Sequence, residues 1–133
     1  MNILTIDYND INISKKFPKS LHDSGFAIIK NHSISQNLIN KVYKDWGKFF
    51  SSDKKNDYLF DYHKQDGYFP FQSESAKGSY EKDLKEFFHI YLPWGRYPDF
   101  IDKDTLILYN EIMLLGKKLL KYINQYSPKK ISK

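Results

Sequence analysis

The chain has 133 residues, which is enough for one domain with one hydrophobic core. It contains no cysteine, so disulfides, thiolate metal sites and a cysteine nucleophile are excluded, and this composition fits a reducing compartment. No apolar run approaches the roughly 20 residues that a membrane-spanning helix needs, and the first residues lack the pattern of a secretory leader. We therefore expect a cytoplasmic protein without a membrane partner.

The net charge of +5 raises the question of nucleic-acid binding. Almost all of the positive side chains are lysines, and Arg96 is the only arginine. Recognition of bases and phosphates usually recruits arginine, whose guanidinium group presents a rigid fork of donors. The lysines are also scattered, and their one compact cluster lies in the basic tail, residues 127–133. We therefore expect no nucleic-acid partner.

The first elements are expected to be short. Residues 4–6 favour a strand before the turn-rich sequence 7–10. Ser14 can cap a brief helix that runs through His22 and ends near Gly25, because glycine readily adopts the left-handed conformation that ends many helices.

A strand that breaks into a capped helix is the most informative stretch of the sequence. Residues 26–29 are apolar strand formers, and a polar corner follows at residues 31–33. The hydroxyl of Ser35 can then accept a hydrogen bond from a free N–H of the first helical turn. The helix is expected over residues 36–50, with one apolar face formed by Leu38, Ile39, Val42, Tyr43, Trp46, Phe49 and Phe50.

The middle of the chain is expected to contain two extended segments joined by a loop. A short polar segment begins at residues 52–55, and residues 67–70 are extended. Residues 72–79 form a loop that turns at Gly78, and residues 86–92 form a strand.

The last helix, expected over residues 103–126, is the longest element. Its apolar residues leave only a narrow polar stripe, which runs through Asn110, Lys117, Lys121 and Asn124 or Gln125. If about 400 Å² of apolar surface stayed exposed, the forgone stabilisation would be on the order of 10 kcal/mol. We therefore expect a catalytic-domain chain or a second copy of this chain to cover the helix.

Several short motifs follow one another from Ile3 to about Tyr126, namely Leu4–Asp7, Gly25–Phe26, Asn31–Ile34, Phe49–Phe50, Lys54–Lys55, Gly67–Tyr68, Asp83–Phe88, Leu92–Pro93 and Pro98. In order and spacing this series resembles the N-terminal region of the isopenicillin N synthase-like oxygenases. The resemblance implies an α+β domain over residues 1–126, with short strands and three to four helices, that is the accessory part of a jelly-roll oxygenase. Ser33 stands where that family usually has glycine. We expect this corner either to avoid a positive φ at Ser33 or to strain the serine.

For a complete family member, the resemblance implies Fe(II) and 2-oxoglutarate as cofactors. It implies a His-x-Asp pair and a distant second histidine as iron ligands, and an Arg-x-Ser pair for 2-oxoglutarate, all on a downstream jelly roll. Two imidazoles and a carboxylate leave coordination positions open for cosubstrate and O₂. None of the four histidines precedes an acidic residue by two positions, and Arg96 is not followed by serine at that spacing. We expect no catalytic, cofactor-binding or metal-binding residue in this chain.

Two residue groups resemble metal sites but have simpler interpretations. Glu86 and His89 would share one face of a helix, as metal ligands do, but would point to opposite faces of a strand. Asp61, His63 and Asp66 could together bind a divalent ion, although a solvated loop is the favoured interpretation.

Specific roles are expected for two single side chains. His32 is expected to hydrogen-bond to backbone at the corner before the second helix. Tyr68 and its neighbours are expected to line a substrate cavity in a complete family member.

Three functional hypotheses remain. The favoured one is the N-terminal module of a 2-oxoglutarate/Fe(II)-dependent oxygenase, truncated or split and inactive alone. The alternative is a non-catalytic interaction module that dimerises or docks a partner through the helix over residues 103–126. A basic nucleic-acid binder is the third.

Overall fold

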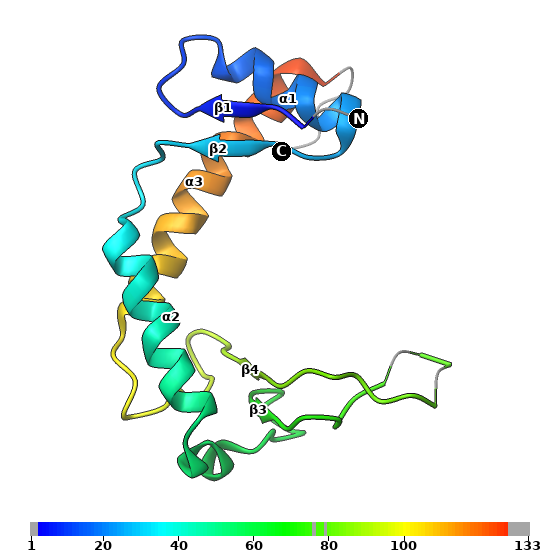
Figure 1. The fold of residues 1–133 in the computed structure, drawn as a ribbon, viewed down its shortest axis with the longest axis vertical. Coiled ribbons are helices and arrows are strands. Elements are labelled where there is room, and N and C mark those ends of the chain that lie inside the picture. Colours follow the sequence, from blue (N-terminus) through cyan, green and yellow to red (C-terminus); the bar gives the residue numbers. More distant parts are fainter. Residues whose placement is uncertain (1–2, 76, 79, 128–133) are drawn as a thin grey trace. The chain divides into compact units, whose positions relative to one another are not determined.

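The computed structural model describes residues 3–75, 77–78 and 80–127. The chain combines helices with short strands (Figure 1), and the strands form two small sheets. This arrangement confirms the predicted α+β class. The elements in order are β1 (Thr5–Asp7), α1 (Ile13–Ser24), β2 (Ile28–Lys30), α2 (Gln36–Phe50), the 3₁₀ helix η1 (Asp53–Tyr58), β3 (Gly67–Phe69), β4 (Phe87–His89) and α3 (Asp104–Tyr126).

The chain folds into two compact units. Unit 1 consists of Met1–Asn40 with Asp104–Lys133, and unit 2 consists of Lys41–Lys103. The predicted boundaries, a domain over residues 1–126 and a basic tail over 127–133, stay a prediction. Residues 128–133 of that tail lie outside the described residues.

Unit 1 is built around a two-stranded parallel sheet and two helices. Strands β1 and β2 lie side by side with Ile6 opposite Ile29, and α1 packs against α3. Ile6, Ile13 and Phe17 form the buried centre of this unit. Apolar side chains from α1, β2 and α3 pack around it, because each of these elements turns one apolar face inward.

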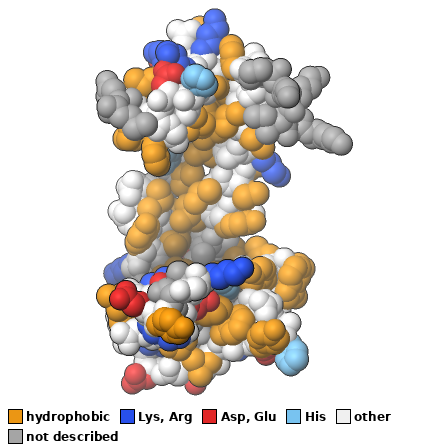
Figure 2. All heavy atoms as spheres, turned by 90° about the vertical axis from the view of Figure 1, so that its right-hand side faces the viewer, with side chains coloured by type: hydrophobic (Ala, Val, Ile, Leu, Met, Phe, Trp, Pro, Cys, Tyr) orange, Lys and Arg blue, Asp and Glu red, His pale blue; other side chains and the backbone are white. Residues whose placement is uncertain are grey.

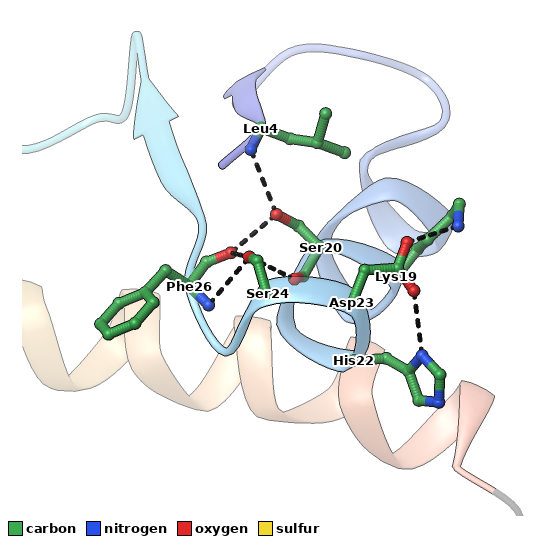
Figure 3. Close-up of polar contacts among 7 residues, drawn as sticks. All are labelled: Leu4, Lys19, Ser20, His22, Asp23, Ser24 and Phe26. Atoms are coloured by element: carbon green, nitrogen blue, oxygen red, sulfur yellow. Dashed lines mark hydrogen bonds and ion pairs between the residues drawn. The ribbon is translucent and has the colours of Figure 1, made fainter. Parts of the chain in front are cut away.

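Two buried serines join the end of α1 to both strands (Figure 3). Ser20 Oγ donates to the carbonyl oxygen of Phe26 at 2.7 Å and accepts from the N–H of Leu4 at 3.4 Å. Ser24 Oγ lies 2.8 Å from the carbonyl oxygen of Ser20 and 2.9 Å from that of Phe26. These hydrogen bonds satisfy backbone groups that would otherwise be left unpaired between helix and sheet.

Of the two predicted ends of α1, the C-terminal end is confirmed and the N-terminal cap is wrong. Gly25 adopts the left-handed conformation (φ 79°), and its N–H bonds to the carbonyl of Leu21, which confirms the predicted helix end. The predicted cap at Ser14 is wrong, since the helix begins at Ile13 and Ser14 lies inside it. The side chain of Asp10 accepts the N–H of Asn12 at 2.8 Å and so forms the turn that leads into the helix.

The corner between β2 and α2 follows the prediction in part. The strand begins at Ile28 rather than at residue 26, because the carbonyl of Phe26 is bonded to the two serines. The positive φ of this corner lies at Asn31 (58°) and not at Ser33, so the serine is unstrained. The hydroxyl of Ser35 accepts the N–H of Leu38 at 3.4 Å, which confirms the predicted cap of α2.

Unit 2 has an aromatic core. Phe49, Tyr68 and Ile101 are buried at its centre, and further rings pack around them. Strands β3 and β4 pair antiparallel, with Tyr68 opposite Phe88. Strand β4 is shorter than the predicted strand 86–92, because the chain turns after residue 90 and the N–H of Gly95 bonds to the carbonyl of Tyr91.

Helix α3 confirms the predicted last helix, and none of its residues is buried in the described chain. Neither this helix nor another described helix combines the length and apolar character that crossing a membrane requires.

Replacing Ser20 by alanine is expected to destabilise the chain by about 1–2 kcal/mol, because the partly buried N–H of Leu4 loses its side-chain acceptor and the carbonyl of Phe26 keeps only Ser24. Urea unfolding followed by circular dichroism measures this change. Ser14→Ala on the same helix is the control and should stay within about 0.5 kcal/mol of the wild type. Equal stability of the two variants would contradict the role given to Ser20.

Candidate functional site

Tyr68, predicted to line a substrate cavity, lies in the core of unit 2. Its side chain is 3 % exposed, and its ring packs against Phe49 and Phe50. Its hydroxyl donates a 2.5 Å hydrogen bond to Glu86 Oε2, and the same oxygen accepts from Lys55 Nζ at 2.9 Å. The polar end of Tyr68 is thus bound within the unit, and contact with a substrate stays a prediction.

The Tyr68–Glu86–Lys55 cluster shifts the pKa of each member. The hydrogen bond from Tyr68, followed by that from Lys55, lowers the pKa of Glu86 because both favour the carboxylate. The hydrogen bond to Glu86 raises the pKa of Lys55. Burial, followed by the bond to Glu86, raises the pKa of Tyr68. At neutral pH the cluster therefore holds an ionised Glu86, a charged Lys55 and a neutral tyrosine.

The favoured interpretation of Asp61, His63 and Asp66, a solvated loop, is confirmed for the exposed His63 and is wrong for the buried Asp66. The side chain of Asp61 accepts the N–H groups of His63 and Lys64 at 2.9 and 3.0 Å. Asp66 is completely buried and forms an ion pair with Arg96, with 3.0 Å between Oδ1 and Nε. The Asp61 carboxylate is therefore bonded to backbone N–H groups, and the Asp66 carboxylate is paired with Arg96.

Arg96 ties three segments of unit 2 together. Its Nη2 donates to the carbonyl oxygens of Leu59 (2.7 Å) and Asp66 (3.2 Å), and its backbone N–H donates to the Asp66 carboxylate. A buried carboxylate needs such pairing, because an isolated charge in the interior is strongly unfavourable. The only arginine of the chain thus has a structural role.

Glu86 and His89 are not brought together. Glu86 bonds to Tyr68 and Lys55, whereas the ring of His89 lies 4.8 Å from the rings of Phe69 and Phe87. This separation follows from the extended backbone of β4, in which side chains alternate between the two faces.

The described residues do not fit an iron site of the expected kind. Among them, no group of three potential ligand side chains that includes a histidine lies close enough to share a metal ion. His22 instead bonds to Asp23 at 3.0 Å, and the ring of His63 packs near Tyr62. This chain's described residues offer no two-histidine, one-carboxylate arrangement for Fe(II).

The expectation for His32 is wrong. Its Nδ1 is buried, and no hydrogen-bond partner is found for it in the described part of the chain. The corner is instead held by Asn31, whose side-chain amide donates to Asp7 at 2.6 Å. A side-chain bond between Asn31 and Asp7, rather than a bond from the histidine ring to backbone, therefore joins this corner to β1.

A family model described as non-haem dioxygenase in morphine synthesis N-terminal matches residues 6–107, which is most of the chain. The chain belongs to this non-haem dioxygenase N-terminal family. The match includes β1, the corner before α2, Tyr68 and the β3–β4 sheet. It confirms the resemblance that the series of short motifs indicated.

Two solved structures are similar to this N-terminal domain. One is a Shewanella oneidensis protein classed as an oxygenase, with 38 % identity and a TM-score of 0.84. The other is a Caulobacter crescentus protein classed in the 2OG-Fe(II) oxygenase family, with 27 % identity and a TM-score of 0.72. They match 96 % and 93 % of this chain, which spans only 44 % and 48 % of theirs. A search of the curated proteins found no match.

Sequence reasoning missed the residues that organise both units. Ser20 and Ser24 carry no signal of their own, because serines are common on exposed helix faces and only the fold buries these two. Arg96 did carry a signal, since a single arginine among many lysines is suited to a bidentate partner. The buried Asp66 could not be identified without the fold.

The Tyr68–Glu86–Lys55 cluster predicts a dependence of stability on pH. Because the folded-state pKa of Glu86 is lowered, its contribution is present above the unfolded-state pKa and is lost as pH falls through the folded-state value. We expect Glu86→Gln to lose on the order of 1–2 kcal/mol at pH 7, and this loss to disappear in acid. Thermal unfolding between pH 7 and pH 3 measures it.

The control for this pH dependence is Glu74→Gln in the same unit, whose ion pair with Lys85 is long and exposed. Its unfolding midpoint should follow that of the wild type at every pH. A Glu86→Gln variant that is equally destabilised at pH 3 and pH 7 would show that the charge of Glu86 contributes nothing.

Proposed function

We propose that this chain is the N-terminal module of a 2-oxoglutarate/Fe(II)-dependent oxygenase and is inactive alone. The observation that carries the proposal is a match to the family's N-terminal model together with the lack of a histidine-containing ligand group among the described residues. Fe(II) and 2-oxoglutarate, when bound to a complete enzyme, supply O₂ activation coupled to conversion of 2-oxoglutarate into succinate and CO₂. The residues of this chain supply the scaffold beside that chemistry.

The purified chain, supplied with Fe(II), 2-oxoglutarate, ascorbate and O₂, is expected to form no succinate above the level of the protein-free reaction. Mass spectrometry of succinate measures this outcome, with a chelator-treated reaction as the second control. Repeated turnover that depends on Fe(II) and stops with the chelator would contradict the proposal.

Exposed apolar residues on α3 support the alternative function, a non-catalytic module that docks a partner. Ile112 is 51 % exposed, and other apolar residues spaced three or four apart lie along the same side of the helix. Figure 2 shows hydrophobic side chains at the surface on the face of the molecule that it draws. We name this set the apolar stripe; it consists of Tyr109, Ile112, Met113, Gly116 and Leu120.

Gly116 lies in the centre of the apolar stripe. A Cβ built on it would meet no other atom within 4 Å, so the helix backbone is open to close approach here. The chain also spans less than half of the similar solved chains. A catalytic domain is therefore the partner that we favour for this surface, and a second copy of the chain is the other.

Ile112→Asp is expected to abolish self-association of the isolated chain, because it places a charge in the centre of the apolar stripe. Light scattering over a range of concentrations measures the association, and the fluorescence of a hydrophobic dye measures the exposed apolar surface. Asn110→Asp adds the same charge on the polar side of α3 and should leave both readouts unchanged. A wild-type chain that is monomeric and binds no dye would contradict the docking function.

A further inference from the structure

A hollow in unit 1 lies between α3 and the polar corners of the sheet. Its volume is about 370 Å³, and both charged and apolar side chains line it. Helix α3 supplies four of the lining residues, and the segments after β1 and β2 supply one each. They are Glu111, Leu114, Leu115, Lys118, Tyr8 and Ser33.

Glu111, which lines this hollow, has an unsatisfied group. Its Oε2 is buried and has no hydrogen-bond partner among the described residues. A buried carboxylate oxygen without a donor is unfavourable, and most such atoms in folded proteins are paired. This oxygen is therefore an acceptor for which the described chain supplies no donor. Among the donors that another molecule can supply, a cationic group makes the strongest hydrogen bond.

Lys118 does not fill this role. Its Nζ donates to the hydroxyl of Tyr8 at 2.9 Å and lies 4.3 Å from the centre of that ring. The hydrogen bond to Tyr8 also raises the pKa of Lys118, so the group is fully charged at neutral pH. It lies seven positions after Glu111, which places their Cα atoms about 10 Å apart along the helix.

We propose that the Glu111 hollow receives the ammonium or guanidinium group of a lysine or arginine side chain from the polypeptide that covers α3. This inference rests on the proposed function, in which a catalytic domain covers the helix. The proposed contact is a charge-assisted hydrogen bond to Glu111 Oε2. Its donor is the cationic group at the end of the apolar stem of the incoming lysine or arginine.

The surroundings of the hollow favour a polypeptide over a free small cation. Leu114 is 67 % exposed at the rim, and Ile107, one turn before Glu111, is also exposed. A free amine or guanidine would leave both side chains in water, whereas a polypeptide covers them while its cation reaches Glu111. This chain spans only 44 % and 48 % of the similar solved chains, so these relatives contain further polypeptide that could supply such a contact.

The first test is an NMR titration of the whole chain with two cationic probes. These are N-ethylguanidinium and the blocked tripeptide acetyl-Leu-Arg-Leu-amide. Both should shift amide signals around Glu111 saturably, and the tripeptide should bind at least tenfold more tightly because its leucines cover Leu114. Equal affinities would identify a free small cation as the occupant and overturn the docking proposal.

Variants and a neutral probe assign the binding to the carboxylate. Glu111→Gln should weaken both cationic probes at least fivefold, whereas the matched control Glu74→Gln in unit 2 should not. N-ethylurea, which has a similar shape without the charge, should not bind. Unchanged affinity in Glu111→Gln, or equal binding of N-ethylurea, would overturn the inference.

Stability of the isolated chain gives an independent readout. Glu111→Gln should raise the midpoint of thermal unfolding, because the variant no longer places an unpaired carboxylate oxygen in a buried position. A lowered midpoint would show that Glu111 already has a partner within the chain and would overturn the inference. Succinate formation by the chain would contradict the proposed function without altering these titrations, so the two failures are distinguishable.

Discussion

The long helix α3 has apolar side chains on most of its surface, yet none of its residues is buried in the described chain. A helix in water depends on tertiary packing for most of its stability. Within unit 1 only its later turns contribute to the core, through Leu119, Tyr122 and Ile123. In the earlier turns Ile107, Ile112 and Met113 stay exposed, and the docking proposals for this chain start from this exposed apolar surface.

The two units differ in the side chains that form their small cores and in the polar groups that accompany them. Unit 1 packs two isoleucines and Phe17 at its centre and uses Ser20 and Ser24 to pair backbone groups where α1 meets the strands. Unit 2 packs aromatic rings around Phe49 and adds the buried pair of Asp66 and Arg96. In both units, polar side chains satisfy groups that the small core cannot leave unpaired. This structural use explains why residues that resembled metal ligands in the sequence do not converge.

Local features of the fold were predictable because they depend on neighbouring residues. The limits of α2 follow from the Ser35 cap and the apolar face, and the end of α1 follows from Gly25. Predictions that depended on distant partners were less successful. Strand β2 begins later in the chain than predicted, because the carbonyl of Phe26 bonds to serines on α1. The buried Nδ1 of His32 lacks the backbone bond that was predicted for it.

The sequence by itself determined the family, the α+β class, the order of the elements and the lack of a His-x-Asp pair, because motif order and spacing are properties of the linear chain. Only the tertiary structure decided which polar groups find partners. It paired Asp66 with Arg96 and Tyr68 with Glu86, and it left Glu111 Oε2 unpaired. Such pairings join residues up to thirty positions apart, and their distances are fixed by packing rather than by local pattern.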